Sequence, residues 1–154
     1  MKIWLTSILT VSAIAIGIVA GLGGYTFYYA KGGSYLSNDP RACINCHVMQ
    51  DHFDSWVKAS HHAAATCNDC HVPHTFPEKY LAKMRNGWNH SKAFTLQNWP
   101  EPIRITPKNL SDLQHNCLHC HNVLVGDIAG HRDIQKGTMS CTNCHRATGH
   151  MAYD

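Results

Sequence analysis

Four copies of the pattern Cys-x-x-Cys-His limit what this 154-residue chain can fold into, because together they contain all eight of its cysteines. The copies occupy residues 43–47, 67–71, 117–121 and 141–145, and the cysteines are Cys43, Cys46, Cys67, Cys70, Cys117, Cys120, Cys141 and Cys144. In each copy the two thiols can form thioethers with the vinyl groups of a porphyrin, and the adjacent histidine can ligate the iron from the same side. We therefore interpret the four copies as attachment sites for four c-type haems.

Zinc sites and thioredoxin-like redox sites also contain Cys-x-x-Cys pairs. Zinc ribbons do not need a histidine directly after the second cysteine, and thioredoxin motifs occur singly on a βαβ unit. The fourfold repetition weighs against both alternatives. No cysteine remains for a structural disulfide, so we expect the haems themselves to hold the fold together. A chain with this many haems is expected to move electrons.

The motifs are regularly spaced. Their first cysteines are separated by 24, 50 and 24 residues, so motifs one and two form a pair that motifs three and four repeat. This spacing predicts two dihaem halves, at about residues 39–75 and 113–151, linked by residues 76–112. Only 44% of residues are hydrophobic and 9% aromatic, which suggests that flat apolar macrocycles replace much of the side-chain core.

The N-terminal segment is apolar. No charged residue lies between Lys2 and Lys31, and Trp4 lies near one end of this run while four aromatic residues lie at positions 25–29 near the other. At about 1.5 Å per residue the run exceeds the ~30 Å hydrocarbon core of a bilayer. A cleaved signal peptide is the alternative, but its apolar region is only ~7–15 residues long. We predict a transmembrane anchor at residues 1–31 and a haem domain at residues 32–154.

The orientation of the anchor follows mainly from haem chemistry. Lys2 and the terminal amine favour a cytoplasmic N-terminus, although Lys31 and Arg41 on the other flank weaken the charge rule. Bacterial c-type haems are attached outside the cytoplasmic membrane, so we expect a single-pass inner-membrane protein with its haem domain in the periplasm. Gly17 and Gly21 form a GxxxG pattern that can pair two such helices, although glycine is common in membrane helices anyway.

The remaining sequence predicts a mainly α fold with little regular structure, in which short helices and loops surround the haems. Asp39 and Pro40 resemble a helix N-cap followed by proline at the first helical position. A helix is expected from Pro77 to residue 86, closed by Gly87. The segment 99–102, Trp-Pro-Glu-Pro, cannot be helical and marks the link between the halves. No alternating strand pattern is present.

Histidines are the candidate axial ligands on the second side of each haem. The chain has 13 histidines, of which four are in the motif position and His119 lies inside motif three. The remaining candidates are His52, His61, His62, His74, His90, His115, His131 and His150. Residue types alone leave the choice among them open.

Several strings carry a specific resemblance. They are residues 39–49 (DPRACINCHVM), the pair Ser60-His61, residues 79–83 (KYLAK) and residues 87–91 (GWNHS). With the haem motifs and the anchor, they resemble the NapC/NirT family of membrane-anchored tetrahaem quinol dehydrogenases over the whole chain. Within this family the short haem domain is most similar to the members that serve a cytochrome c nitrite reductase.

The resemblance implies a set of axial ligands. Met49 would replace His47 on the first haem iron, and the alternative is that Met49 only packs on the haem. The proximal ligands of haems two, three and four would be His71, His121 and His145. His61, with His62 as an adjacent rival, would cross to haem four, and His150 would cross to haem three. The sixth position of haem two stays open, because a lysine of the partner subunit fills it in one branch of the family; His74 is more simply an ordinary nearby or surface histidine.

The resemblance also implies a quinol site on the predicted helix of the linker. Lys83 matches a lysine near the first haem that can bind a quinol oxygen or help remove a proton. His90 occupies a position where some relatives have an acidic residue, and a histidine can accept a quinol proton near neutral pH. His90 could instead ligate an iron or lie at the surface. The simplest alternative for Lys79, Lys83 and Arg85 is a solvated basic face near lipid head groups.

The implied function is oxidation of menaquinol and transfer of electrons through the four haems to a multihaem nitrite reductase catalytic subunit. This chain itself is not expected to reduce nitrite, because no lysine occupies a haem-motif position. Two alternatives are a quinol-oxidising hub for several periplasmic reductases and an electron relay without a quinol site. The net charge of +3 does not indicate nucleic-acid binding, because no basic run is present.

Overall fold

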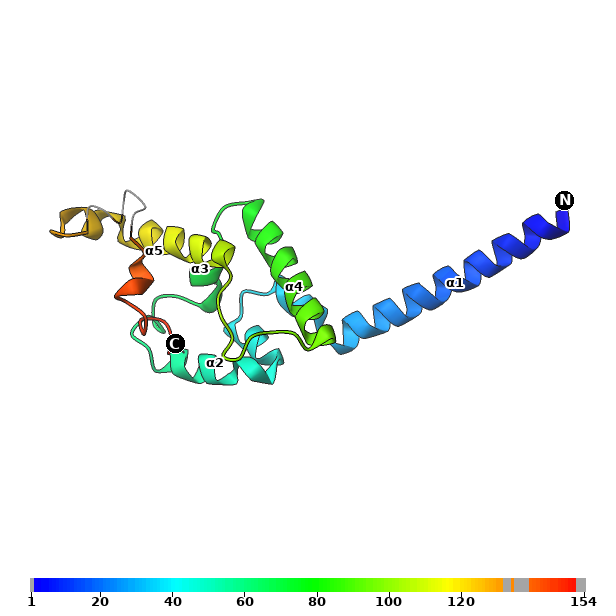
Figure 1. Ribbon diagram of the computed structural model, residues 1–154, viewed down its shortest axis with the longest axis horizontal. Helices are drawn as coiled ribbons and strands as arrows, with labels where there is room; N and C mark the ends of the chain where they lie inside the picture. The colour runs from blue at the N-terminus through cyan, green and yellow to red at the C-terminus, as the bar shows by residue number, and fades with distance from the viewer. Residues whose placement is uncertain (1, 132–133, 135–138, 152–154) are drawn as a thin grey trace. The chain divides into compact units, whose positions relative to one another are not determined.

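The computed structural model describes residues 2–131, 134 and 139–151, and in this part of the chain it contains helices and no strand (Figure 1). The mainly α fold expected from the sequence is confirmed. The chain divides into two compact units, Met1–Ser34 and Tyr35–Asp154, which are described separately below. Residues 132–133 and 135–138, within the predicted second dihaem half, lie outside the described part.

The first unit is built on α1, Lys2–Tyr29, a helix of 28 residues. Its most apolar window has a mean hydropathy of 2.2, and none of that window is buried against protein. At about 1.5 Å per residue the helix is longer than the ~30 Å core of a bilayer. By length and composition α1 can therefore cross a membrane. A side chain at Gly32, just after α1, would collide with the ring of Phe27, with a closest approach of 2.4 Å.

The second unit begins with motif one on two short 3₁₀ helices, η2 (Pro40–Asn45) and η3 (His47–Met49), followed by α2 (Gln50–Val57). Asp39 Oδ1 accepts a hydrogen bond from the backbone N–H of Arg41 at 2.9 Å, and Pro40 follows as the first residue of η2. The predicted N-cap is thus confirmed. The structure adds that the helix is of the 3₁₀ type and ends before the second cysteine of the motif.

Motifs two and three lie on helices that pack against each other. Motif two forms α3, Cys67–His71, and motif three lies within α5, Pro107–Asp127. Asn116 of α5 donates hydrogen bonds to the backbone carbonyls of Cys70 and Val72, both at 2.9 Å. Motif four lies at η4, Cys141–Asn143, where the backbone N–H of Cys141 donates to Gln114 Oε1 of α5 at 2.8 Å. Helix α5 therefore positions three of the four motifs.

The predicted helix in the linker is longer than expected. Helix α4 spans Glu78–Leu96 and does not end at Gly87; it ends where Gln97 adopts a left-handed conformation with φ 53°. The prediction was wrong because a glycine does not by itself end a helix; Gly87 lies beside the ring of Tyr35, where even a Cβ would be at an ordinary contact distance of 3.6 Å. A glycine inside a helix costs only about 1 kcal/mol. Helices α4 and α5 are longer than the short helices expected, with 19 and 21 residues.

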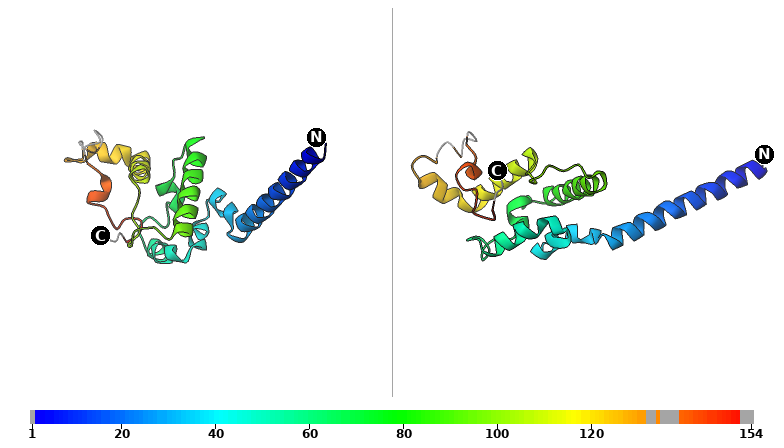
Figure 2. Two further views of the ribbon diagram at one scale, coloured as in Figure 1. Left: turned by 45° about the vertical axis from the view of Figure 1, so that its right-hand side comes forward. Right: turned by 60° about the horizontal axis from the view of Figure 1, so that its bottom comes forward.

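Polar contacts fasten α4 to α5. Arg85 Nη2 lies 3.1 Å from Asp112 Oδ2, and Lys108 contacts the other oxygen of the same carboxylate. Asn109 Nδ2 donates to Asn86 Oδ1 at 3.1 Å. Between the two helices, residues 98–106 are not helical, as the prolines predicted. Figure 2 shows these helices joined by irregular segments.

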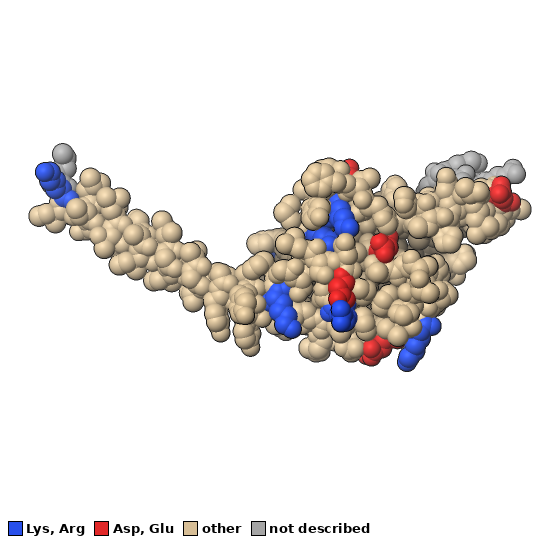
Figure 3. Space-filling view, turned by 180° about the vertical axis from the view of Figure 1, so that it is seen from behind, with Lys and Arg blue, Asp and Glu red and all other residues tan. Residues whose placement is uncertain are grey.

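Few side chains form a core. In the described part of the chain, four apolar side chains are buried, those of Val72, Ala82, Val125 and Ile134. Large apolar side chains on α4 are instead exposed, among them Trp88 at 71% and Phe94 at 70%. A domain normally buries a contiguous set of apolar side chains, so the protein groups alone do not make an ordinary core. In the view of Figure 3 the basic side chains are separated from one another and form no continuous stripe.

Candidate haem sites and the Lys83–His90 region

The cysteines of different motifs lie next to each other. The thiols of Cys43 and Cys67 lie close enough to interact, and so do those of Cys117 and Cys141. Cys70 lies close enough to Cys120 to be influenced by its charge. Motif one is therefore adjacent to motif two, motif two to motif three, and motif three to motif four. All eight cysteines are unbridged thiols, as attachment to a porphyrin requires.

Three motif histidines each face a second histidine from elsewhere in the chain. The ring centroids of His71 and His150 are 5.9 Å apart, and those of His61 and His121 are 6.0 Å apart. The centroids of His131 and His145 are 6.4 Å apart. Two imidazoles on opposite sides of one metal ion, each at a metal–nitrogen distance of about 2 Å, have centroids roughly 6 Å apart. The three pairs therefore have the separation expected of two axial ligands of one iron.

The pairing differs from the expectation drawn from resemblance. His61 lies beside the histidine of motif three rather than that of motif four, and His150 lies beside the histidine of motif two rather than that of motif three. A tertiary contact explains the position of His150. The backbone N–H of Met151 donates to Ser55 Oγ of α2 at 2.7 Å, which holds the C-terminal segment against the first half of the domain.

Other candidate histidines are engaged in different contacts. His62 packs edge-on against Trp56 with centroids 4.5 Å apart. His74 Nε2 lies 3.0 Å from the carbonyl of Asp69, and its ring stacks on that of His119. His115 Nδ1 donates to the carbonyl of Ser111 at 2.7 Å. His52 meets the ring of His150 edge-on at 4.9 Å. These contacts agree with an ordinary role for His62 and His74.

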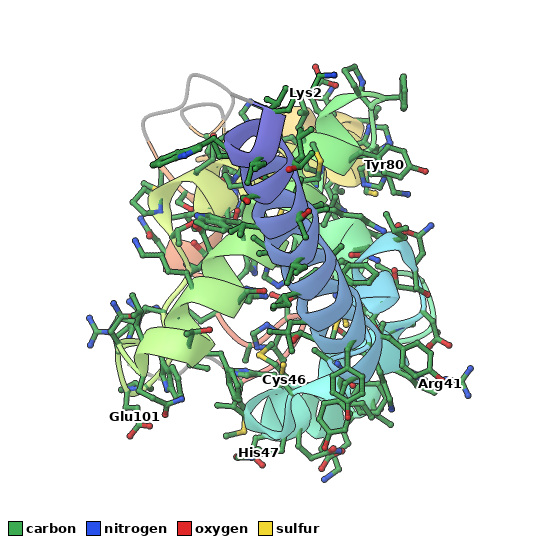
Figure 4. All side chains as sticks on the ribbon, turned by 90° about the vertical axis from the view of Figure 1, so that its right-hand side faces the viewer. Lys2, Arg41, Cys46, His47, Tyr80 and Glu101 are labelled. Carbon is green, nitrogen blue, oxygen red and sulfur yellow. The ribbon has the colours of Figure 1, made fainter. Side chains whose placement is uncertain are left out.

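Motif one has a distinct arrangement. Met49 is half-buried in η3, whereas His47, two residues earlier, is exposed. Cys46 and His47 both follow η2, from which the side chain of Arg41 extends outward (Figure 4). The burial of Met49 relative to His47 is in keeping with a thioether ligand at this motif.

Lys83 is buried and fully engaged by the segment that precedes motif one. It is 4% exposed, and its Nζ donates to Ser37 O at 2.8 Å, to Asn38 Oδ1 at 2.9 Å and to Leu36 O at 3.3 Å. Asn68 of α3 donates to the same Ser37 carbonyl at 3.1 Å. Burial lowers the pKa of Lys83. An ammonium has three protons, and all three are used here; the solvated basic face considered above does not describe Lys83.

His90 is held by a tyrosine that the sequence did not single out. Tyr35 Oη lies 3.0 Å from His90 Nδ1. Burial raises the pKa of Tyr35 to about 12, so the phenol stays protonated at neutral pH, and desolvation lowers the pKa of His90, which favours the neutral imidazole. In the tautomer whose Nδ1–H donates to Tyr35 Oη, the lone pair of the neutral His90 ring is on Nε2. Lys83 and His90 are seven residues apart on α4 and therefore share a helix face.

Sequence reasoning missed Tyr35 entirely, because an isolated tyrosine before a motif carries no signal. It also left His131 among eight equal candidates, since only the fold brings that ring to motif four. The amides of Asn116, which is buried, and of Asn68, which is half-buried, join motif two to neighbouring segments and could not be separated from ordinary polar residues in the sequence.

These features define a class of protein. Unbridged cysteines in repeated attachment motifs, paired histidines and a sparse core fit several covalently bound haems, so the chain is a multihaem c-type cytochrome of electron transport. It belongs to the NapC/NirT cytochrome c family, whose N-terminal region matches residues 4–154.

Individual relatives agree with the family. The cytochrome c-type protein NrfH of Wolinella succinogenes is 37% identical over 148 residues, which cover 90% of this chain and 84% of that protein. The cytochrome c nitrite reductase subunit NrfH of Nitratidesulfovibrio vulgaris is 30% identical over 79% of this chain and 73% of its own length. NapC of Escherichia coli K12 is 25% identical over 94% of this chain and 86% of its own length.

A solved structure is similar as well. It is the crystal structure of the cytochrome c nitrite reductase NrfHA complex bound to the HQNO inhibitor. The matching chain superimposes with a TM-score of 0.65 at 26% identity, and the match covers 93% of this chain and 90% of that one. The resemblance noted in the sequence is confirmed at the level of the family.

Proposed function

We propose that this protein is a membrane-anchored quinol dehydrogenase that oxidises menaquinol and delivers electrons through four c-type haems to the multihaem catalytic subunit of a nitrite reductase. The observation that carries the proposal is the set of adjacent motifs with paired histidines in a chain 37% identical to a NrfH protein. The solved relative is a NrfHA complex with a bound inhibitor, which supports both a partner subunit and a ligand site. The chain donates electrons and does not itself reduce nitrite.

The cysteines and candidate axial ligands of this chain are of the right type and number to hold four haems. The two cysteines of each motif would form the thioethers, and His71, His121 and His145 would be the proximal ligands. His150 would be the second axial ligand of the iron at motif two, and His61 that of the iron at motif three. Their ring centroids lie 5.9 and 6.0 Å from those of the respective proximal histidines. Met49 would be the ligand at motif one. A bound haem supplies one-electron transfer, with a potential that depends on these ligands.

The order of the motifs supports a linear path. The thiol contacts join motif one to two and three to four, and Cys70 connects the two halves through Cys120. We infer that the dihaem halves at residues 39–75 and 113–151 act in this order, from motif one toward motif four. We place the entry point at motif one because the proposed proton acceptor, His90, contacts Tyr35 in the segment that precedes this motif.

A quinol must lose two electrons and two protons to become a quinone. We place the first proton acceptor at His90 Nε2, since Tyr35 engages Nδ1 and desolvation keeps the ring neutral. Lys83 has its protons committed to Leu36, Ser37 and Asn38. Its role at this site is therefore to hold the segment that carries Tyr35 and motif one against α4, and not to bind the quinol directly.

The location follows from α1 and from haem attachment. We infer that α1 anchors the protein in the inner membrane with Lys2 at the cytoplasmic side and the haem domain, residues 32–154, in the periplasm. Gly17 and Gly21 offer a surface for self-association of two anchors, because a Cβ at either glycine would meet no other atom of this chain within 4 Å.

The experiment that tests the function begins with gentle detergent extraction of native membranes. After purification, nitrite reduction driven by a menaquinol analogue is assayed without oxygen. We expect a second haem protein to co-purify and quinol-dependent nitrite reduction to survive. If the chain is isolated alone yet is still reduced by quinol, it serves several reductases as a hub, as its likeness to NapC would suggest. If quinol does not reduce it, it is a relay without a quinol site.

A further inference from the structure

We propose that the outward face of α4, formed by Leu81, Met84 and Trp88, lies in the lipid head-group region of the bilayer that α1 spans. The proposal rests on the membrane anchor of the proposed function and goes beyond it, because it assigns a second membrane contact to the haem domain itself. The three side chains are 53%, 63% and 71% exposed. A single exposed apolar side chain is common in soluble proteins, but a contiguous row of large ones marks a surface that binds a partner or a membrane.

The three residues form a stripe along the helix. Their spacing of i, i+3 and i+7 is that of one helix face, and the stripe extends over about 10 Å at 1.5 Å per residue. With 3.6 residues per turn, it lies about 180° around the helix from Ala82, Lys83 and Asn86. A helix with an apolar stripe along its length buries that stripe in a membrane by lying parallel to the membrane plane.

The opposite face of α4 contacts the rest of the haem domain. Ala82 is 2% exposed, and Lys83 Nζ donates to the carbonyl of Ser37 in the segment before motif one. Asn86 Oδ1 accepts a hydrogen bond from Asn109 of α5. The segments that carry the motifs lie on this side of the helix, so haems bound there pack on this side as well. The stripe of Leu81, Met84 and Trp88 faces away from them.

The covalent chain keeps α4 close to the membrane. Helix α1 ends at Tyr29, and Tyr35 follows six residues later. Even fully extended, six residues span at most about 20 Å. Tyr35 in turn contacts the middle of α4, because a Cβ at Gly87 would lie 3.6 Å from its ring and its Oη lies 3.0 Å from His90 Nδ1. The part of α4 that carries Trp88 is therefore tethered within a short distance of the membrane end of α1.

The side chains on this face have the chemistry of a lipid interface. Tryptophan is enriched at the boundary between membrane and water, where its ring contacts acyl chains while its N–H reaches polar groups. Lys92 follows Trp88 by one turn and is exposed, so its ammonium can reach a lipid phosphate. The one acidic residue of α4 is Glu78, at the first position of the helix. The stripe therefore carries no carboxylate that lipid contact would remove from water.

The test uses the full-length, haem-loaded protein in nanodiscs of phosphatidylglycerol and phosphatidylethanolamine, without a partner subunit. The photo-crosslinking residue benzoylphenylalanine replaces Trp88 in one variant and Met84 in a second. In the matched control it replaces Val123, an apolar residue of α5 that is 81% exposed. After irradiation, mass spectrometry identifies whether each position has bound a phospholipid, another part of the chain, a haem or a second copy of the chain.

We expect phospholipid adducts at positions 84 and 88 and none above the unirradiated background at position 123. Trp88→Glu, added to the variant with the crosslinker at position 84, should reduce the lipid adducts there, because a carboxylate is costly to remove from water. Val123→Glu in the same background should leave them unchanged. Adducts at positions 84 and 88 that join only protein, haem or a second copy would overturn the proposal. Equal lipid adducts at position 123 would overturn it too, since the domain would then have no preferred face toward the membrane.

Quinol-dependent reduction of the haems, measured in the same nanodiscs with the wild-type protein, separates this proposal from the proposed function. Reduction by a menaquinol analogue without lipid adducts at positions 84 and 88 would remove the membrane-binding face and leave the quinol dehydrogenase intact. Lipid adducts without reduction by quinol would support the face and refute the proposed function.

Discussion

The phenol of Tyr35 and the imidazole of His90 are in hydrogen-bond contact, with 3.0 Å between Oη and Nδ1, although 55 residues separate them in the sequence. The contact joins the segment before motif one to the middle of α4. It engages Nδ1 of His90, so Nε2 is the ring nitrogen that this contact does not use. The proton-acceptor site that we propose therefore involves two residues that no sequence motif connects.

The pH dependence of quinol oxidation tests the role of His90. Desolvation lowers the pKa of His90 below its ordinary value of about 6.5. The neutral ring, which accepts the proton, therefore predominates at pH 7 and is lost only as the pH falls through the lowered pKa. We expect quinol-dependent haem reduction to be constant above pH 6.5 and to decline at lower pH. His90→Gln should be slower by about 10²-fold and lack this decline. A decline that persists in His90→Gln would assign the proton acceptor elsewhere.

Removal of the Lys83 side chain separates a structural role from a quinol-binding role. Lys83→Ala leaves three oxygen acceptors without their buried ammonium, and we expect a loss of about 2–4 kcal/mol of unfolding free energy. Thermal unfolding in detergent, followed by circular dichroism, measures the change. Lys92→Ala, at an exposed position of the same helix, is the control and should change stability by less than about 0.5 kcal/mol. Unchanged stability of Lys83→Ala together with lost quinol oxidation would point to direct quinol binding.

The carboxylate of Asp112 should matter far more than that of Asp39. The side chain of Asp112 is 6% exposed between Arg85 and Lys108, whereas Asp39 and Arg41 form an ion pair with side chains 40% and 78% exposed. Arg85→Ala leaves the buried carboxylate with fewer partners and should cost about 2–3 kcal/mol. Arg41→Ala should cost at most about 1 kcal/mol. Equal shifts in melting temperature would show that the α4–α5 contact contributes little.

Met49 is expected to ligate the iron at motif one. In Met49→Leu, magnetic circular dichroism should lose the methionine-to-iron signal of the oxidised protein, because leucine has no donor atom. Met84→Leu is the control, since Met84 is 63% exposed on α4 and lies outside the haem motifs. A spectrum that is the same in wild type and Met49→Leu would mean that Met49 only packs against the haem.

The pairing of His71 with His150 can be tested with double variants. If both rings bind one iron, the His71→Met/His150→Met protein has one altered haem, whereas His121→Met/His150→Met has two. The altered haems are counted by magnetic circular dichroism, after mass spectrometry has established that all haems are attached. One altered haem in the second double variant would restore the pairing of His150 with motif three.

The sequence predicted those features that depend on local chemistry. A c-type haem attachment site needs two cysteines and a histidine within five consecutive residues, so the motifs could be recognised without the fold. An apolar run without charges indicates a membrane span by length alone, and the cap at Asp39 involves a backbone N–H only two residues away. The prolines of residues 99–102 likewise exclude a helix locally.

Gly87 shows where local rules failed. A glycine in a helical pattern is a common stop signal, but here the helix continues to Leu96. The ring of Tyr35 lies beside Gly87, because the segment before motif one packs on this part of α4. A glycine that ends a helix and a glycine inside one look the same in the sequence, and the contacts that the rest of the helix makes distinguish them.

By itself the sequence therefore determined the haem motifs, the apolar anchor and the mainly helical class, because each depends on covalent chemistry or on residues close in the chain. The tertiary structure decided that His150 returns to His71, that His61 reaches His121 and that His131 approaches His145. It also decided that the buried Lys83 side chain binds the backbone before motif one and that Tyr35 is in hydrogen-bond contact with His90. Ligand pairs and buried hydrogen bonds join residues far apart in the sequence, and their partners depend on how the helices pack.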